Sequence, residues 1–180
     1  MTLPAVLETP RLHLRRPSAG DADQVFSRFA SDAAATRYLA WPRHQTLHDT
    51  RAYLERCDSE WETTGAGPYL VFTREGLLIG STGIHLDTDA PYRACTGYVL
   101  APDAWGRGYA TEVACAMAEL ALSVPQIARV YSFCHREHLA SAHVLEKAGF
   151  VREGVLRRYL VFPNLGEQEP SDVLLYATVR

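Results

Sequence analysis

Two glycines, Gly106 and Gly108, stand in a short turn that follows an apolar strand and leads directly into a helix with apolar periodicity. The segment reads Tyr98-Val-Leu-Ala-Pro-Asp-Ala-Trp-Gly-Arg-Gly-Tyr-Ala-Thr-Glu112. Because glycine has no Cβ atom, a ligand can approach the main chain there, and the unpaired N–H groups of a helix's first turn carry a partial positive charge. The pattern favours an anionic cofactor held by backbone N–H groups.

Two common phosphate-binding signatures are not met by this turn. A Walker loop ends in Gly-Lys-Ser or Gly-Lys-Thr, and a dinucleotide fingerprint needs a small residue three places after Gly108, where this chain has Thr111. The turn instead resembles motif A of the GNAT family of N-acetyltransferases, Gln/Arg-x-x-Gly-x-Gly/Ala, which binds the pyrophosphate of acetyl-CoA. Gly108 and Ala110 fit its last two positions, and Trp105 stands where Gln or Arg is usual. Trp105 to Glu112 is similar to the variant found in ribosomal-protein N-terminal acetyltransferases of the RimJ/RimL type.

A second segment, from His138 to Phe150, predicts a short amphipathic helix, with Gly149 placed to end it. Its apolar face consists of Leu139, Ala142, Leu145 and Ala148. The segment also resembles the second GNAT motif, Ser-x-x-x-Leu-Glu-Lys-x-Gly-Phe, with Ser141 as its first residue. The family usually has Asn three residues before that serine, where this chain has His138.

A third resemblance lies near the amino end, where Glu8-Thr-Pro-Arg-Leu-His-Leu-Arg15 is similar to the opening strand of the RimJ/RimL-type enzymes. The motifs occur in the family's order and spacing, and the resemblance runs from about residue 7 to residue 176. It is weakest over residues 36–61. The resemblance implies the GNAT fold, an α+β fold with a mixed, mostly antiparallel sheet flanked by helices, in which one parallel strand pair splays apart.

The order of predicted elements agrees with such a fold, because strand, helix and strand in succession favour a parallel pair at Tyr98 and Val130. A capping box at Asp21-x-x-Gln24 opens a helix, and Glu75-Gly76 is a hairpin turn. Strands are predicted over residues 11–16, 69–74, 77–86, 94–100, 127–134, 150–159 and 172–178, with helices over 46–61, 108–122 and around 141 and a polar loop over 163–170. Gly97 predicts either a bulge or close approach in its strand, or is incidental there.

In GNAT enzymes the pantetheine arm of acetyl-CoA enters between the splayed strands and pairs with their backbone. The resemblance implies that the residues at the matching positions of this chain bind the cofactor. These residues are Val99, Leu100, Ala101, Gly106, Arg107, Gly108, Tyr109, Ala110, Thr111, His138 and Ser141. Neutral histidine offers one donor and one acceptor, as asparagine does, but with a different reach. The contact of His138 with the pantetheine amide is therefore kept, weakened or replaced.

Moving an acetyl group from a thioester to an amine needs a neutral amine, a stabilised oxyanion and a proton for the leaving thiolate. The resemblance implies direct attack in a ternary complex, with a backbone N–H near Leu100 polarising the carbonyl and Ser141 acting as the general acid. The alternative for Ser141 is a purely structural role in the first turn of its helix.

The general base is open among four residues, Glu112, His85, Glu62 and Tyr98, and each has a structural explanation as well. Glu112, for example, suits the positive end of its helix. A dedicated base is not required, because an α-amine with a pKa near ~7.7–8.0 is already partly neutral at cytosolic pH.

Metal chemistry is not expected. His135, His138 and His143 lack acidic or thiolate partners at a recognised spacing. The cysteines, Cys57, Cys95, Cys115 and Cys134, are scattered in apolar contexts, which predicts buried free thiols.

Length and composition predict one cytoplasmic domain over residues 1–180, with 47% hydrophobic and 22% charged residues. The net charge of −3 disfavours a nucleic-acid partner, and no apolar stretch has the length of a membrane span or the form of a signal peptide. We expect a monomer or a homodimer.

Two classes of function remain. The first is an N-acetyltransferase that acts on a protein's amino terminus, as the resemblance implies, or on a small amine such as an amino acid, polyamine or antibiotic. The second is a catalytically silent acyl-CoA binder or sensor, and the presence of Ser141 favours the enzyme. Acceptor choice is expected to reside in residues 41–61 and 159–170, where the resemblance is weak.

Overall fold

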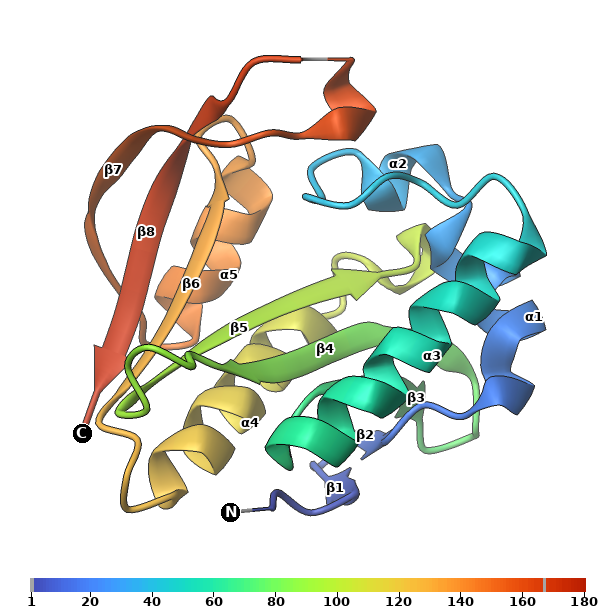
Figure 1. Ribbon diagram of the computed structural model, residues 1–180, viewed down its shortest axis with the longest axis horizontal. Coiled ribbons are helices and arrows are strands. Elements are labelled where there is room, and N and C mark those ends of the chain that lie inside the picture. The colour runs from blue at the N-terminus through green and yellow to red at the C-terminus, as the bar shows by residue number, and fades with distance from the viewer. Residues whose placement is uncertain (1, 167) are drawn as a thin grey trace.

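A computed structural model describes residues 2–166 and 168–180, and over these residues the strands form one eight-stranded sheet in the order β1-β2-β3-β4-β5-β6-β8-β7 (Figure 1). The strands are β1 (Val6–Glu8), β2 (Leu12–Arg15), β3 (Pro68–Thr73), β4 (Leu78–Leu86), β5 (Arg93–Leu100), β6 (Arg129–His135), β7 (Val151–Leu160) and β8 (Ser171–Val179). Neighbouring strands are antiparallel except β5 and β6, which are parallel. The predicted mixed sheet is confirmed.

The helices cover both faces of this sheet. The α-helices are α1 (Ala22–Val25), α2 (Ala33–Thr36), α3 (Leu47–Thr64), α4 (Tyr109–Ser123) and α5 (Leu139–Lys147). Short 3-10 segments are η1 (Ala19–Asp21), η3 (Pro102–Ala104) and η4 (Pro163–Leu165), and η2 (Phe26–Ala30) is a π-helix. None of the helices in the described ranges combines the length and apolar character that crossing a membrane requires.

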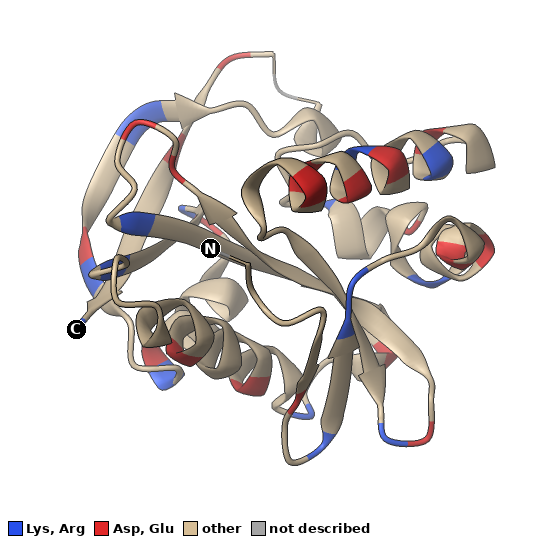
Figure 2. Ribbon diagram, turned by 60° about the horizontal axis from the view of Figure 1, so that its bottom comes forward, with Lys and Arg blue, Asp and Glu red and all other residues tan. Residues whose placement is uncertain are grey.

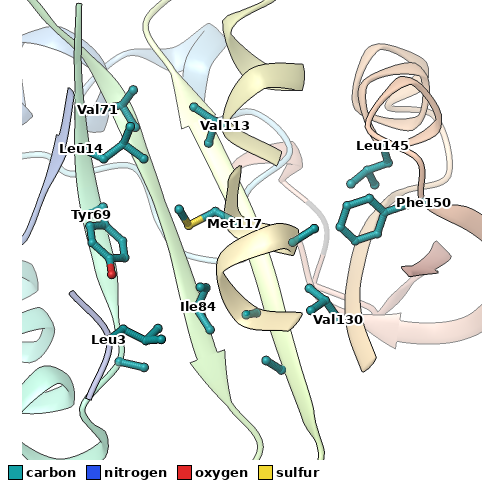
Figure 3. Close-up of a cluster of buried hydrophobic side chains, with 14 of the residues drawn as sticks. Leu3, Leu14, Tyr69, Val71, Ile84, Val113, Met117, Val130, Leu145 and Phe150 are labelled. Carbon is teal, nitrogen blue, oxygen red and sulfur yellow. The ribbon is translucent and has the colours of Figure 1, made fainter. Parts of the chain in front are cut away.

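The core has two parts because the central strands are buried on both faces. Every residue of β3 is buried, and successive side chains of a strand point to opposite sides. Leu70 belongs to the cluster that includes residues of α1 and α3, whereas Val71 belongs to the larger cluster that includes residues of α4 and α5. Figure 3 shows Met117 of α4 in this larger cluster, close to Ile84 of β4.

The ends of α3 follow from its sequence. Thr46 caps the helix by accepting a hydrogen bond from the backbone N–H of Asp49, whose carboxylate in turn accepts from the Thr46 backbone. At the other end Gly65 has a φ of 73°, a left-handed conformation that glycine adopts without strain. The predicted helix over residues 46–61 is confirmed and extends to Thr64.

The amino-terminal region differs from its prediction in two respects. A hairpin, β1 and β2, replaces the single predicted strand. The predicted capping box at Asp21 and Gln24 is wrong, because Ser18 is the cap and Asp21 is its partner three residues later. The Asp21 carboxylate accepts hydrogen bonds from the Ser18 backbone and hydroxyl and from Arg15, an ion pair that the local pattern does not reveal.

The parallel pair is short. β5 and β6 are paired only from Arg93↔Arg129 to Cys95↔Tyr131, although β5 continues to Leu100 and β6 to His135. Beyond that point the two strands diverge in Figure 1. We call residues 96–100 of β5 and 132–135 of β6 the wedge. The predicted splay of this pair is confirmed.

Gly80 on β4 is required where β5 approaches most closely. A Cβ atom there would stand 2.1 Å from the Val99 carbonyl oxygen. We expect Gly80→Ala to lower the free energy of unfolding by about 1–3 kcal/mol, the usual cost of overpacking. Urea denaturation would measure it. Gly97→Ala on β5 is the matched control, because a Cβ at Gly97 meets nothing within 4 Å and no bulge interrupts its pairing. An equal loss in both variants would contradict the steric explanation.

Residues 1 and 167, which belong to the predicted domain and to the predicted loop over 163–170, lie outside the described residues.

Candidate active site

The turn before α4 has the geometry expected of an anion site. Gly106 and Gly108 have φ values of 73° and 78°, and Gly108 is the amino-terminal cap of α4. No side chain caps this helix, and residues 105–108 are exposed. The N–H groups of its first turn therefore face a ligand without competition from a capping side chain. We call residues 105–108 with the start of α4 the phosphate turn.

Trp105, the departure from motif A, ties the phosphate turn to the end of β5. Its indole N–H donates to the Leu100 carbonyl oxygen at 2.9 Å, while its ring is half exposed. Ala101 is similarly engaged, because its N–H donates to Ile79 at 2.8 Å and its carbonyl accepts from Ala104 at 2.9 Å. Both backbone groups of Ala101 and the carbonyl of Leu100 are thus already hydrogen-bonded within the protein.

Three elements meet at the Ser141 hydroxyl, on the first turn of α5. The Tyr98 hydroxyl, from β5, lies 3.0 Å from Ser141 Oγ and 3.2 Å from the Ser141 carbonyl oxygen. Cys134 of β6 is a further neighbour, because the Ser141 side chain influences the pKa of its thiol. Ser141 is therefore placed at the wedge, where the predicted cofactor arm would end.

The two neighbours of Ser141 keep their protons at neutral pH. Burial raises the pKa of the Tyr98 hydroxyl, and it raises the pKa of the Cys134 thiol to about 11, a rise that the Ser141 side chain partly opposes. The Ser141 hydroxyl is thus surrounded by neutral groups, and Tyr98 is held as a donor rather than as a base.

Glu112 holds the amino-terminal hairpin against α4. Its carboxylate accepts hydrogen bonds from the Thr9 hydroxyl at 2.6 Å, the Arg11 backbone N–H at 2.9 Å and Arg11 Nε at 2.6 Å. Partial burial alone would raise the pKa of this carboxyl, but these bonds outweigh it and hold the pKa below its usual value. A base working near neutral pH needs the opposite shift. These contacts argue against Glu112 as the base.

Two of the other candidate bases are engaged by partners at the surface. His85 Nδ1 lies 2.6 Å from Glu60, and Glu62 lies 2.7 Å from Arg16. His85 is also paired with Cys95, at the closed end of the wedge, whereas Ser141 contacts Tyr98 farther along β5. The structure therefore brings Tyr98 and Ser141 together and leaves the other candidates elsewhere.

His138 contacts the segment that precedes α3. Its ring stacks on Tyr38 with centroids 4.5 Å apart, and His135 stacks on the same tyrosine at 5.3 Å. Burial, and then the charge of His135, lower the pKa of His138, so its imidazole is neutral at pH 7. Whether it also contacts a pantetheine amide stays a prediction. Among residues 2–166 and 168–180, no three His, Cys, Asp or Glu side chains are grouped as metal ligands would be.

A second side of the site was not predicted in detail. Asn164 joins the loop after β7 to the segment between α2 and α3, since its amide donates to the carbonyls of Thr36 at 2.8 Å and Trp41 at 2.9 Å and accepts from the Arg43 N–H at 2.8 Å. Phe162 meets His135 edge to face at 4.8 Å. We call residues 36–44 with 162–164 the loop junction.

The loop junction lies beside a depression at the carboxyl end of β6. The depression has a volume of about 410 Å³ and is lined by His135, Arg136, Glu137, Ser171 and Asp172. No motif in the sequence marked Tyr38, Phe162 or Asn164, because they lie where the resemblance is weak or absent. Phe162 and Asn164 fall within residues 159–170, where acceptor choice was expected, whereas Tyr38 lies outside both segments named for that choice.

Comparison with known proteins agrees with this geometry. The family model described as "Acetyltransferase (GNAT) domain" matches residues 11–151. A Bacillus subtilis protein named uncharacterized N-acetyltransferase YoaA is 28% identical over 176 residues, 97% of either chain. A Bacillus anthracis GNAT acetyltransferase is 25% identical, with a TM-score of 0.81 over 97% of this chain and 98% of that one.

The same fold occurs in RimL, a ribosomal L7/L12 α-N-protein acetyltransferase solved with coenzyme A. It is 20% identical to this chain, with a TM-score of 0.81 over 99% of this chain and 98% of that one. The family model spans most of the sequence, including the phosphate turn and α5. The chain therefore belongs to the GNAT family and is an acetyl-CoA-dependent N-acetyltransferase.

Proposed function

We propose that residues 1–180 form one GNAT domain that transfers the acetyl group of acetyl-CoA to a primary amine, by direct attack in a ternary complex. The observation that carries this proposal is the position of Ser141 at the wedge, hydrogen-bonded to Tyr98 of β5, with the phosphate turn following the same strand. A cofactor with a pyrophosphate and an extended arm fits these two features together.

The phosphate turn and the wedge would bind different parts of acetyl-CoA. The uncapped first turn of α4 would receive the pyrophosphate, at Gly106 to Thr111, and the edge of β5 at Val99 and Leu100 would receive the arm. A Cβ at Gly106 would meet nothing within 4 Å, so the turn is open on that side. When bound, acetyl-CoA supplies an acyl group activated as a thioester.

Ser141 completes the reaction. Ser141 would give its hydroxyl proton to the leaving sulfur as the amine nitrogen bonds to the acetyl carbon and the carbon–sulfur bond breaks, and it would then regain a proton from water. The Tyr98 hydroxyl, which keeps its own proton, lies 3.0 Å from Ser141 Oγ and would donate to that oxygen once the serine has lost its proton. With Glu112 engaged by Arg11, the amine's surplus proton leaves to water, as the pKa of an α-amine allows.

The loop junction is where we place the acceptor amine, which would enter the site past Tyr38 and Phe162. Because RimL, with the same fold, is an α-N-protein acetyltransferase, we propose a protein amino terminus as the acceptor. The site would then receive a flexible peptide end between residues 36–44 and the loop after β7. The alternative acceptor is a small-molecule amine, and the test must distinguish it from a protein amino terminus.

Free thiol released from acetyl-CoA tests this proposal. When the enzyme is given acetyl-CoA and short peptides with free amino termini, free thiol of CoA should appear. The same peptides with acetylated termini should give no thiol. A panel of amino acids, polyamines and aminoglycosides covers the small acceptors. Acetyl-CoA binding without turnover on any amine would contradict the enzymatic proposal and would indicate an acyl-CoA sensor.

His138 should make stability depend on pH. Its pKa is lowered in the folded protein but near ~6.5 in the unfolded chain, so below pH 6.5 the unfolded state binds the proton first. The free energy of unfolding therefore falls as pH drops from 6.5 through the lowered value. In urea denaturation at pH 7.5 and 5.5, His138→Asn should reduce this loss. The control is His143→Asn, at an exposed position of the same helix. Identical pH slopes for wild type and His138→Asn would contradict the prediction.

A further inference from the structure

The turn between β1 and β2, residues 9–11, reaches the phosphate turn although more than ninety residues separate them in sequence. Arg11 makes three contacts there. Its Nη1 donates to the Arg107 carbonyl at 2.9 Å, its Nε donates to Glu112 at 2.6 Å, and its guanidinium lies 4.8 Å from the centre of the Tyr109 ring. Figure 2 shows both basic and acidic positions along the lower edge of the ribbon.

The contact with the Arg107 carbonyl controls the direction of an N–H group. That carbonyl and the Gly108 N–H belong to one peptide unit, which is planar and trans, so they point in opposite directions. Glycine at positive φ tolerates many peptide orientations, so a contact from outside the turn can select one of them. By holding the carbonyl oxygen, Arg11 turns the Gly108 N–H away from itself and toward the open side of the turn.

The contact with Glu112 removes an electrostatic obstacle. Glu112 lies in the first turn of α4 and is ionised, because its pKa is lowered. A bare carboxylate there would repel a phosphate at the same helix end. The guanidinium of Arg11 pairs with this carboxylate, and the Thr9 hydroxyl and Arg11 N–H occupy its other lone pairs.

We propose that Arg11 is a positioning residue for the cofactor: it orients the Arg107–Gly108 peptide and neutralises Glu112 so that the phosphate turn receives a pyrophosphate. The inference rests on the proposed binding of acetyl-CoA at this turn. It gives the amino-terminal hairpin a function in cofactor affinity, and it gives Glu112 a structural task in place of the catalytic one.

The test compares two acetyl donors. Acetyl-CoA carries the pyrophosphate, and acetyl-pantetheine has the same thioester without it. We expect Arg11→Ala to raise the Kd for CoA and the KM for acetyl-CoA by roughly 10-fold or more, the scale of a lost charge-assisted hydrogen bond. The kcat, the KM for the amine and the rate with acetyl-pantetheine should stay near wild type. Unchanged Kd and KM in Arg11→Ala would overturn the proposal, as would an equal loss with both donors, which indicates general damage.

Arg74→Ala is the matched control. Arg74 binds Glu8 and the Thr9 carbonyl of the same hairpin, and neither contact involves the phosphate turn. Its loss should leave the Kd for CoA unchanged. A rise equal to that of Arg11→Ala would overturn the proposal, because any loosening of the hairpin would then suffice.

Arg11→Lys separates orientation from charge and serves if Arg11→Ala does not fold. Lysine keeps the charge but lacks the two-pronged guanidinium that reaches Glu112 and the Arg107 carbonyl together. Its affinity for CoA should stay well below wild type. Full recovery would overturn the orienting role. Failure of the wild-type protein to bind CoA would instead refute the proposed function on which this inference rests.

Discussion

Replacing Gly108 with valine is expected to weaken acetyl-CoA binding about 10- to 100-fold. At a φ of 78° a side chain is strained, and a β-branched one most of all. A Cβ there would also lie 3.4 Å from Arg11 Nη2, so the added methyl groups would push against the group that we propose orients the turn. Isothermal titration calorimetry with acetyl-CoA would measure the change.

The control for this substitution is Gly149→Val at the end of α5. Gly149 has a similar φ of 84°, and a Cβ there meets nothing within 4 Å. It carries a comparable backbone strain without a place in the phosphate turn. Gly149→Val should lose stability but keep its affinity for acetyl-CoA. Unchanged affinity in Gly108→Val would refute the assignment of the pyrophosphate to this turn.

Ser141→Ala is expected to lower kcat by roughly 100-fold or more while the Kd for acetyl-CoA stays the same, because the variant loses only the proton donor for the thiolate. Single-turnover release of thiol would separate this step from binding.

Tyr98→Phe makes the companion measurement. It removes the hydroxyl that lies 3.0 Å from Ser141 Oγ and leaves the serine itself in place. A smaller decrease in kcat than in Ser141→Ala fits a supporting role for Tyr98. Parent-level turnover in Ser141→Ala would mean that this serine serves only the structure of α5.

Local patterns in the sequence predicted the elements that local interactions determine. The glycine turn of the β3–β4 hairpin and the helical spacing of Ala142 and Leu145 in α5 are each complete within a few residues. The predicted face of α5 was wrong at Leu139, which is exposed, and the capping box at Asp21 and Gln24 was wrong although it is local. The splay of β5 from β6 was available only through resemblance. Nothing in the periodicity of either strand states where their pairing stops.

Contacts between distant residues account for what was missed. The Glu112 carboxylate is explained by Thr9 and Arg11, which are 103 and 101 residues away. A glutamate in the first turn of a helix is equally compatible with a role as general base and with a structural role until those partners are known. Tyr38 gave no signal for the same reason, since its stacking partner His138 belongs to another part of the chain. One sequence shows spacing along the chain but not pairing across it.

The hydrogen bonds of the Asn164 amide affect the order in which parts of the site can form during translation. Its partners Arg43, Trp41 and Thr36 precede it by 121, 123 and 128 residues. Because the ribosome releases a chain from the amino end, residues 36–43 emerge early and must wait for Asn164 before they are fixed. The hairpin, Arg11 and the start of α4 are all synthesised well before that. A nascent chain stopped short of Asn164 would contain the residues of the phosphate turn but would lack both β8 and the amide that holds residues 36–43, where we propose the amine binds.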